Sequence, residues 1–193
     1  AKLSQFITDG IEEYRFGEIA RELYNFFWNE FCNWYIELSK GVLSGDDAQA
    51  KLQAQRNLVF VLDTALRLLH PVMPFVTEAI WEHLPVEKDA DALMVANWPE
   101  PAELAKWIDE DAEAAITAAT GVISSVRAIR ARYGLSPRQE LAVQLRCSEE
   151  EAARIKEQAE LITSMGRISE LGFCDAKPAD SAVTLANGIE VDT

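Results

Sequence analysis

The residue types that usually carry out catalysis are sparse in this sequence and are poorly spaced for it. Its only histidines are His70 and His83, and its three cysteines, Cys32, Cys147 and Cys174, are far apart. A structural zinc site needs four such ligands at close spacing, so we expect none. The sequence also has no glycine-rich phosphate loop and no Gly-x-Ser-x-Gly elbow. We therefore expect neither catalytic nor metal-ligating residues in these 193 residues.

Amide and cationic side chains, by contrast, recur at helical spacing near the start of the chain. At about 100° per residue, one helix face spanning roughly 120° collects three asparagines flanked by two cations. Asparagine is a mediocre helix former, so a surface helix gains no local stability from three of them. The face is either an ordinary solvated surface or one that hydrogen-bonds base edges while its cations contact phosphates. With one arginine just upstream, the candidates are Arg15, Arg21, Asn25, Asn29, Asn33 and Lys40.

Charge is distributed unevenly along the chain, whose net charge is −14. Residues 121–146 carry five Arg and one Glu, which gives +4. Residues 85–120 carry two Lys and nine Asp or Glu, which gives −7. The acidic total argues against a uniformly basic nucleic-acid binder, yet the potential depends on local arrangement, so RNA contact is confined to a small face. Arg127, Arg130 and Arg132 are candidates for phosphate contacts, although Arg127 and Arg130 could instead pair with the acidic loop at 86–100.

The elements that must position these residues are mostly helices. Apolar periodicity predicts a helix over 16–40, with Gly17 as N-cap and Gly41 as its end. Tyr24, Trp28 and Tyr35 widen its apolar stripe, and we expect Trp28, Trp34 and Tyr35 in the core rather than as platforms on which bases stack. The pattern predicts further helices over 47–69, from residue 74 and over 101–133, the last with a core stripe running from Ile108 to Ile129.

The last fifty residues change character. Residues 140–147 alternate as a strand does, and Ser148 followed by Glu151 predicts a capping box that opens a helix to about residue 163. Further strands are expected at 168–174, 181–186 and 189–192, the last two flanking Asn187-Gly188, a strong hairpin signal. The predicted fold is therefore mainly α: an antiparallel helix bundle over 1–134, then a small α+β subdomain over 135–193.

Composition also bears on the cellular compartment of the protein and on whether it spans a membrane. No apolar run reaches about 18 residues, so we expect no transmembrane helix and no membrane partner. Few, widely separated cysteines are typical of a reduced cytoplasmic protein. The first residue is not Met and the opening already reads as helix, so we expect a piece of a longer protein.

Two runs of residues carry a family resemblance over nearly the whole chain. The run from Leu23 to Lys40, with its Phe31-Cys32-Asn33-Trp34-Tyr35 segment, resembles the anticodon-binding bundle of valyl-tRNA synthetases. The run from Leu68 to Trp81, which contains His-Pro-Val-Met-Pro-Phe, is similar to a motif shared by the valyl, isoleucyl, leucyl and methionyl members of class I aminoacyl-tRNA synthetases. The stretches at 97–99 and 126–137 also fit. Asn33 stands where the family more often has Asp, and Ile36 where it has Leu.

The resemblance implies a part of a valine–tRNA ligase that binds the anticodon arm of valine tRNA but does not itself catalyse. It implies that ATP and Mg²⁺ are used by a separate catalytic domain, that misacylated tRNA is edited by another inserted domain, and that a coiled coil follows the small sheet. Neither His-x-Gly-His nor Lys-Met-Ser-Lys-Ser occurs in these residues. The alternatives are an isoleucyl- or leucyl-type bundle and a helical protein–protein interaction module.

Overall fold

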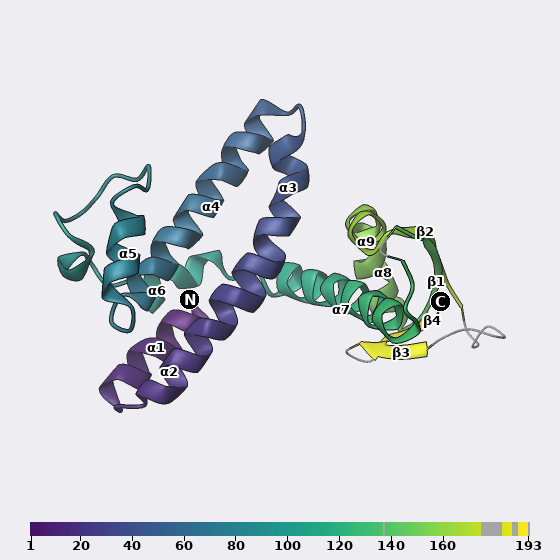
Figure 1. Cartoon of the computed structure of the whole chain (residues 1–193), viewed down its shortest axis with the longest axis horizontal. Coiled ribbons are helices and arrows are strands. Elements are labelled where there is room, and N and C mark those ends of the chain that lie inside the picture. The colour runs from purple at the N-terminus through teal and green to yellow at the C-terminus, as the bar shows by residue number, and fades with distance from the viewer. Residues whose placement is uncertain (137, 175–182, 187–188, 193) are drawn as a thin grey trace. The chain divides into compact units, whose positions relative to one another are not determined.

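The computed structural model describes residues 1–136, 138–174, 183–186 and 189–192. The chain divides into two compact units, Ala1–Ile108 and Asp109–Thr193 (Figure 1). The first is helical, and the second combines helices with a small sheet. This confirms the predicted mainly α fold with a small α+β appendage.

The first unit is built around one long helix. Figure 1 shows α2 (Phe16–Tyr24), η1 (Asn25–Tyr35) and α3 (Ile36–Ser44) as one continuous rod. α1 (Lys2–Glu12) packs against its first part and α4 (Ala48–Leu69) against its last. The side chain of Asp47 caps α4 by accepting hydrogen bonds from the amides of Gln49 and Ala50. α4 is thus found where the periodicity predicts it.

The long helix differs from its predicted bounds at both ends. It begins at Phe16 with Arg15 as N-cap, so Gly17 lies inside it. It passes through Gly41 and ends at Ser44, where Gly45 adopts an extended backbone with φ −68° and ψ 174°. A helical glycine costs about 1 kcal/mol relative to alanine but does not forbid a helix. The predicted stop at Gly41 was therefore wrong.

The middle of this helix, η1, is a π-helix, which the sequence analysis did not predict. A π-helix makes i→i+5 hydrogen bonds, is rare, and is frequent at functional sites. Aromatic side chains pack along its inner side: the Phe27 and Phe31 ring centroids lie 5.6 Å apart, and those of Phe31 and Tyr35 6.0 Å apart. Phe31 is the buried member of this segment.

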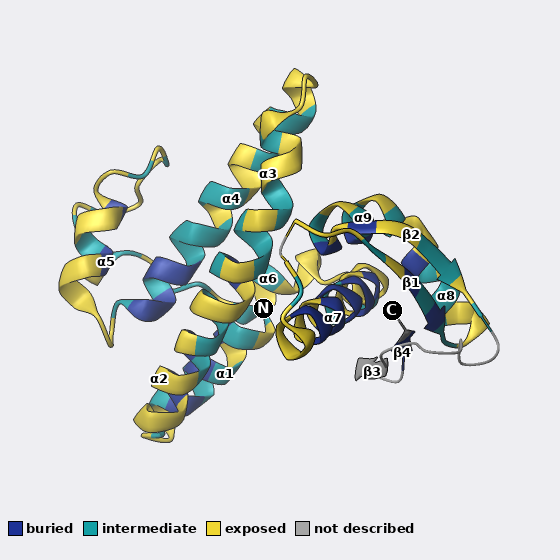
Figure 2. Cartoon of the chain, turned by 45° about the vertical axis from the view of Figure 1, so that its right-hand side comes forward, coloured by how far each residue is buried: buried dark blue, intermediate teal, exposed yellow. Residues whose placement is uncertain are grey.

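The core of the first unit lies where α1, α2 and the end of α4 meet. Ile7, Ile19, Leu23 and Leu68 are buried there. Gly10 permits the close approach of α1 and α2, because a Cβ at this position would lie 2.8 Å from Cγ1 of Ile19. Figure 2 shows exposed and half-buried residues toward the α3–α4 turn, and α3 has no buried residue. The long helix therefore has large solvent-facing surfaces.

A charged network holds the acidic loop against α4 and α5 (Pro74–Trp81). Nη1 and Nη2 of Arg67 each donate to one carboxylate oxygen of Asp89 at 3.0 Å, and Nε donates to Asp63 at 2.9 Å. Asp63 also accepts the indole N–H of the buried Trp81 at 2.7 Å. Asp89 in turn accepts the backbone N–H of Asn97 at 3.0 Å. The Arg67 side chain therefore fixes the loop by paired charge-assisted hydrogen bonds.

The second unit begins later than the predicted helix over 101–133. Two short pieces, α6 (Pro101–Leu104) and η3 (Ala105–Trp107), precede a break at Ile108 and Asp109, and α7 runs from Glu110 to Tyr133. Asp109 accepts the backbone N–H of Ala112 at 3.0 Å and so caps α7. Because of this break Ile108 is exposed, and the buried stripe of α7 starts at Ala115.

The sheet of the second unit has the strand order β2-β1-β4-β3. β1 (Leu141–Arg146) and β2 (Ile168–Phe173) pair in parallel, while β4 (Ile189–Asp192) pairs antiparallel with β1 and with β3 (Val183–Ala186). Helices α8 (Glu149–Glu157) and α9 (Ala159–Gly166) connect β1 to β2 where one helix was expected. The Ser148–Glu151 capping box is confirmed. The predicted turn at Asn187-Gly188 and Pro137 lie outside the described residues.

Helix α7 belongs to this second unit by its packing. It contacts α8, α9, β3 and β4. The compact unit therefore starts at Asp109, whereas the sequence placed the boundary between residues 134 and 135. Gly134, at φ +64°, ends α7 in the left-handed conformation that favours glycine.

Arg130 ties α7 to two turns of the second unit. Its residue surface is 9% exposed, and Nη1 donates to the carbonyl oxygens of Ser136 and Gln139 at 3.2 and 2.5 Å. Nη2 donates to the carbonyl oxygens of Gly166 and Arg167 at 3.2 and 2.9 Å. One guanidinium thus satisfies four backbone acceptors at the ends of α7 and α9.

We predict that Asp89→Asn destabilises the first unit. Hydrogen bonds from Arg67, with a further one from Asn97, lower the pKa of Asp89 from 3.8 to about 2. Because this folded-state pKa lies below the unfolded value, its contribution is present above about pH 4 and is lost as pH falls toward 2. Chemical unfolding at pH 7 should show a loss of about 1–2 kcal/mol, allowing for the solvent exposure of the pair. The variant should also lose stability less steeply than wild type between pH 4 and pH 2, and equal slopes would contradict the assignment. Asp91→Asn, in the same loop, is the control.

We further predict that Arg130→Met lowers the unfolding free energy of the second unit by about 2–4 kcal/mol, since buried carbonyls lose their donors. Urea unfolding followed by circular dichroism measures this. Arg132→Met, exposed on the same helix, is the matched control and should change the unfolding free energy by less than about 0.5 kcal/mol. Equal effects of the two substitutions would contradict the structural role of Arg130.

Candidate functional site

The predicted hydrogen-bonding face is carried by a single rod. Arg21 lies in α2, the three asparagines lie in η1, and Lys40 lies in α3. Arg21, Asn29, Asn33 and Lys40 are exposed, and Asn25 is half-buried. The structure therefore places these five candidates on one continuous helix, and leaves four of them accessible to a ligand.

Arg15 is placed differently from the others. As the N-cap of α2 it is half-buried, and its guanidinium pairs with Glu13 at 2.6 Å and with Glu18 at 2.9 Å. The hydrogen bonds to Glu18 and then to Glu13 raise the pKa of Arg15 further above its ordinary value. The Arg15 guanidinium also lies 5.3 Å from the centre of the Phe6 ring. Arg15 thus makes structural contacts at the α1–α2 turn.

Three aromatic side chains on the rod are exposed, namely Phe16, Tyr24 and Trp28. Tyr24 is 62% exposed and Trp28 is 54% exposed. The prediction that Trp28 lies in the core was wrong: Phe27 and Phe31 take the inward positions, which turns the neighbouring Trp28 outward. Trp34 and Tyr35 are half-buried. The sequence did contain a signal for exposed rings, because the aromatic stripe of this helix is too wide for one buried face.

Carboxylates outnumber cations along this rod. Between Phe16 and Ser39 the sequence has one cation, Arg21, and four glutamates. Partial burial, and then the nearby charge of Glu22, raise the pKa of Glu30. Lys40 is ion-paired with Glu37. This electrostatic setting is unfavourable for a phosphate backbone and compatible with neutral base edges.

The arginines of α7 divide into two groups. Arg127 and Arg132 are exposed, and the Arg132 guanidinium lies 5.8 Å from the centre of the exposed Tyr133 ring. Arg130 is buried with its N–H groups bonded to four carbonyls, so its prediction as a phosphate contact is corrected. The partners of its guanidinium are backbone oxygens of the second unit.

His70 has a structural role at the junction of α4 and α5. Its Nδ1 atom lies 2.8 Å from the hydroxyl of Thr77, which is itself buried and donates to the carbonyl of Met73 at 2.8 Å. These contacts link the end of α4 to the start of α5.

Within the described ranges, no group of three or more His, Cys, Asp or Glu side chains could hold a metal ion. Nor does any helix in those ranges have the length and apolarity needed to cross a membrane.

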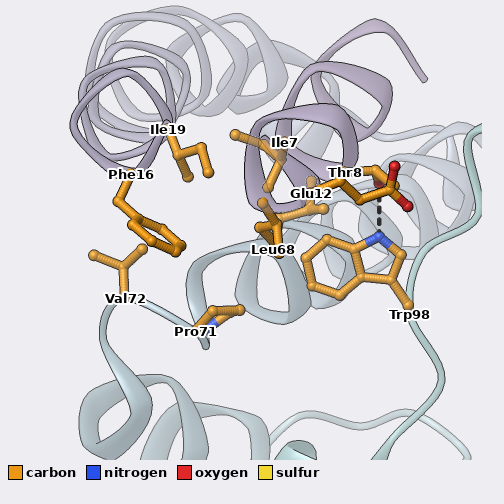
Figure 3. A pocket seen from close by; sticks show the side chains of 10 residues that line it. Ile7, Thr8, Glu12, Phe16, Ile19, Leu68, Pro71, Val72 and Trp98 are labelled. Carbon is orange, nitrogen blue, oxygen red and sulfur yellow. Dashed lines mark hydrogen bonds between the residues drawn. The ribbon is translucent and has the colours of Figure 1, made fainter. Parts of the chain in front are cut away.

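A pocket of about 450 Å³ opens beside the core of the first unit (Figure 3). Its walls are mostly apolar, with Ile7, Phe16, Leu68 and Trp98 pointing toward the space. The indole N–H of Trp98 donates to the hydroxyl of Thr8 at 2.9 Å, so this polar group of the lining is already satisfied. The pocket offers apolar contact and has no arrangement of an acid, a base and a nucleophile.

Comparison with known proteins gives the family of the chain. A family model described as the anticodon-binding domain of tRNA ligase matches residues 1–145. The valine–tRNA ligase of Syntrophotalea carbinolica is 42% identical over 94% of this chain and 20% of its own length. That of Geobacter sulfurreducens is 39% identical over 95% of this chain and 21% of its own length. That of Lactiplantibacillus plantarum is 50% identical over 65% of this chain and 14% of its own length.

The chain therefore spans about a fifth of the length of the curated relatives that match most of it. The matched range covers the rod with its exposed asparagines and aromatic rings, and it extends through α7 into β1. On these grounds the chain belongs to the family of anticodon-binding domains of tRNA ligases.

Proposed function

We propose that this chain recognises the anticodon arm of a valine-accepting tRNA as part of a valine–tRNA ligase. The observation that carries the proposal is the exposed amide face of the rod, within a domain whose family binds anticodons. Valine is named because the relatives with 39–50% identity are valine–tRNA ligases. The residues proposed to read the RNA are Arg21, Asn25, Asn29, Asn33 and Lys40.

The asparagines are suited to base edges for a chemical reason. Each amide offers two donors and one acceptor oxygen, which match the mixed donor and acceptor pattern of an unpaired base. The bases of a hairpin loop are exposed in this way, whereas those of a duplex are stacked and paired. Asn29 and Asn33 are exposed a turn apart on η1, so one loop could span both of them.

Phosphate contacts are proposed for Arg127 and Arg132 on α7. Both side chains are exposed. The rest of the chain is acidic, so few counterions are released on binding and the affinity of these 193 residues alone should be modest. In the parent enzyme most of the affinity would come from several domains acting together.

The parent activity follows from the same proposal. It would attach valine to its tRNA with ATP and Mg²⁺ on a catalytic domain, with a further domain for editing, in the cytoplasm. This chain would then contact those domains as well as the tRNA. An isoleucyl- or leucyl-type parent is the alternative that the choice of tRNA tests directly.

We predict that Asn29→Ala and Lys40→Ala each weaken binding of a valine tRNA transcript, by about three- to tenfold, as one hydrogen bond or ion contact is lost. Because both side chains are exposed, the melting temperature should change by less than about 2 °C. Titration monitored by fluorescence anisotropy at low and moderate salt measures the affinity. Gln55→Ala, an exposed amide on α4, is the matched control and should bind as wild type does.

Two further RNAs test the specificity of binding: a valine tRNA transcript with a swapped anticodon, and an isoleucine tRNA. Wild type should bind both less tightly than valine tRNA. If neither valine tRNA nor its swapped version binds, or both bind alike, the anticodon-reading proposal fails. If isoleucine tRNA binds best, the isoleucyl-type parent is correct. A large fall in melting temperature for Asn29→Ala would place that residue in the core.

A second prediction concerns the charge of the rod. Glu30→Gln removes a carboxylate whose pKa is raised by partial burial and by Glu22. A raised carboxyl pKa means that the ionised form weakens the fold above that pKa, so the variant should be slightly more stable than wild type at pH 7. It should also bind RNA about two- to threefold more tightly at low salt, since one repulsion is removed. Glu157→Gln, exposed on α8, is the control, and an equal gain from it would indicate a net-charge effect.

A further inference from the structure

Tyr24 and Trp28 form an aromatic pair that the fold leaves in solvent. They are 62% and 54% exposed, although both rings lie on the same rod as the buried Leu23 and Phe31. Their spacing of four residues makes them neighbours one turn apart on a helix. Trp28 also lies within η1, and π-helical segments are frequent at functional sites.

We propose that Tyr24 and Trp28 are a stacking platform for unpaired bases of the bound anticodon loop, an inference that rests on the proposed function. Every base has a flat face, and proteins that bind single-stranded RNA stack bases on exposed aromatic rings. Each ring here is followed in sequence by an asparagine, Asn25 after Tyr24 and Asn29 after Trp28. Asn25 also lies three residues before Trp28, a spacing at which side chains on a helix are neighbours. A base stacked on Trp28 would therefore have an amide group beside it for its polar edge.

The charges around the pair favour bases over other ligands. Arg21 is the one cation between Phe16 and Ser39, and Glu18, Glu22, Glu30 and Glu37 lie along the same stretch. Such a surface disfavours phosphate groups and anionic lipid headgroups. Neutral bases experience no such penalty, and the exposed rings of Tyr24 and Trp28 offer them aromatic faces.

The platform also differs from the apolar surface around α5. Phe75 is 91% exposed, and it sits among Val72, Met73 and Val76, which are exposed as well. The stretch 71–76 has no amide or charged side chain to read a base edge. Aliphatic surroundings of this kind are typical of a surface that packs on protein. An aromatic pair interleaved with asparagines has the composition of a base-binding face.

The test replaces each ring in the 193-residue chain and measures binding of an anticodon stem-loop RNA by titration. Trp28→Leu and Tyr24→Leu should each raise the Kd about 5- to 100-fold, because a stacked base contributes about that much to binding. Trp28→Phe keeps a flat ring and should stay within about threefold of wild type. Phe75→Leu, which removes the more exposed ring on α5, is the matched control and should bind as wild type does. All four variants should melt within about 3 °C of wild type, since the replaced side chains are exposed.

A second readout reports the stacking itself. An RNA with 2-aminopurine in the anticodon loop changes its fluorescence when the base stacks on a protein ring. The change seen with wild type should be kept by Trp28→Phe and lost in Trp28→Leu. If leucine serves as well as phenylalanine in both readouts, the site needs apolar contact rather than a ring, and the platform is overturned. If wild type distinguishes valine from swapped anticodons while both leucine variants bind normally, the stacking inference fails and the proposed function stands. If wild type makes no such distinction, the proposed function fails first.

Discussion

The long helix of the first unit has more aromatic side chains than the core can bury. Seven of the twelve residues from Tyr24 to Tyr35 are aromatic. The rod that carries them packs against α1 on its first part and α4 on its last, so its middle cannot bury every ring. Phe31 takes the buried position, Phe27 and Tyr35 line up beside it, and Tyr24 and Trp28 are left in solvent. Rings spaced four residues apart contact one another at a tilt of 31° along the π-helical stretch. The excess of rings over core explains why Tyr24 and Trp28 remain exposed.

Several cations of this acidic chain serve as internal ties. Arg15 holds the α1–α2 turn, Arg67 holds the acidic loop to α4, and Arg130 holds two turns of the second unit. In each case a planar guanidinium with several donors meets acceptors from more than one segment, which lysine could not do with the same geometry. The rod itself has two cations, Arg21 and Lys40, beside its exposed amides and rings.

The sequence predicts those parts of the fold that depend on local chemistry. The helix over 47–69, the Ser148–Glu151 box and the alternation of β1 are set by neighbours within a few residues, and all three are found. The break at Asp109, the passage through Gly41 and the π-helix depend on packing that periodicity cannot see. For the site, Asn29, Asn33 and Lys40 are exposed, and their role in reading RNA stays a prediction. Arg130 could not be excluded from sequence, because its four acceptors come from residues 136 to 167.

A surface that recognises bases without a strong phosphate term has a consequence for specificity. Phosphate contacts strengthen binding to every tRNA alike, so they raise affinity without discriminating. On the rod, an incorrect base would leave an asparagine donor or acceptor unpaired, and each such loss lowers affinity by a factor that a correct tRNA does not suffer. Weak electrostatic attraction between the rod and the tRNA backbone then favours discrimination, because a mismatched loop gains little binding energy from phosphate contacts. Under the proposed function, the carboxylates of the rod would therefore contribute to selectivity by the same repulsion that limits its affinity.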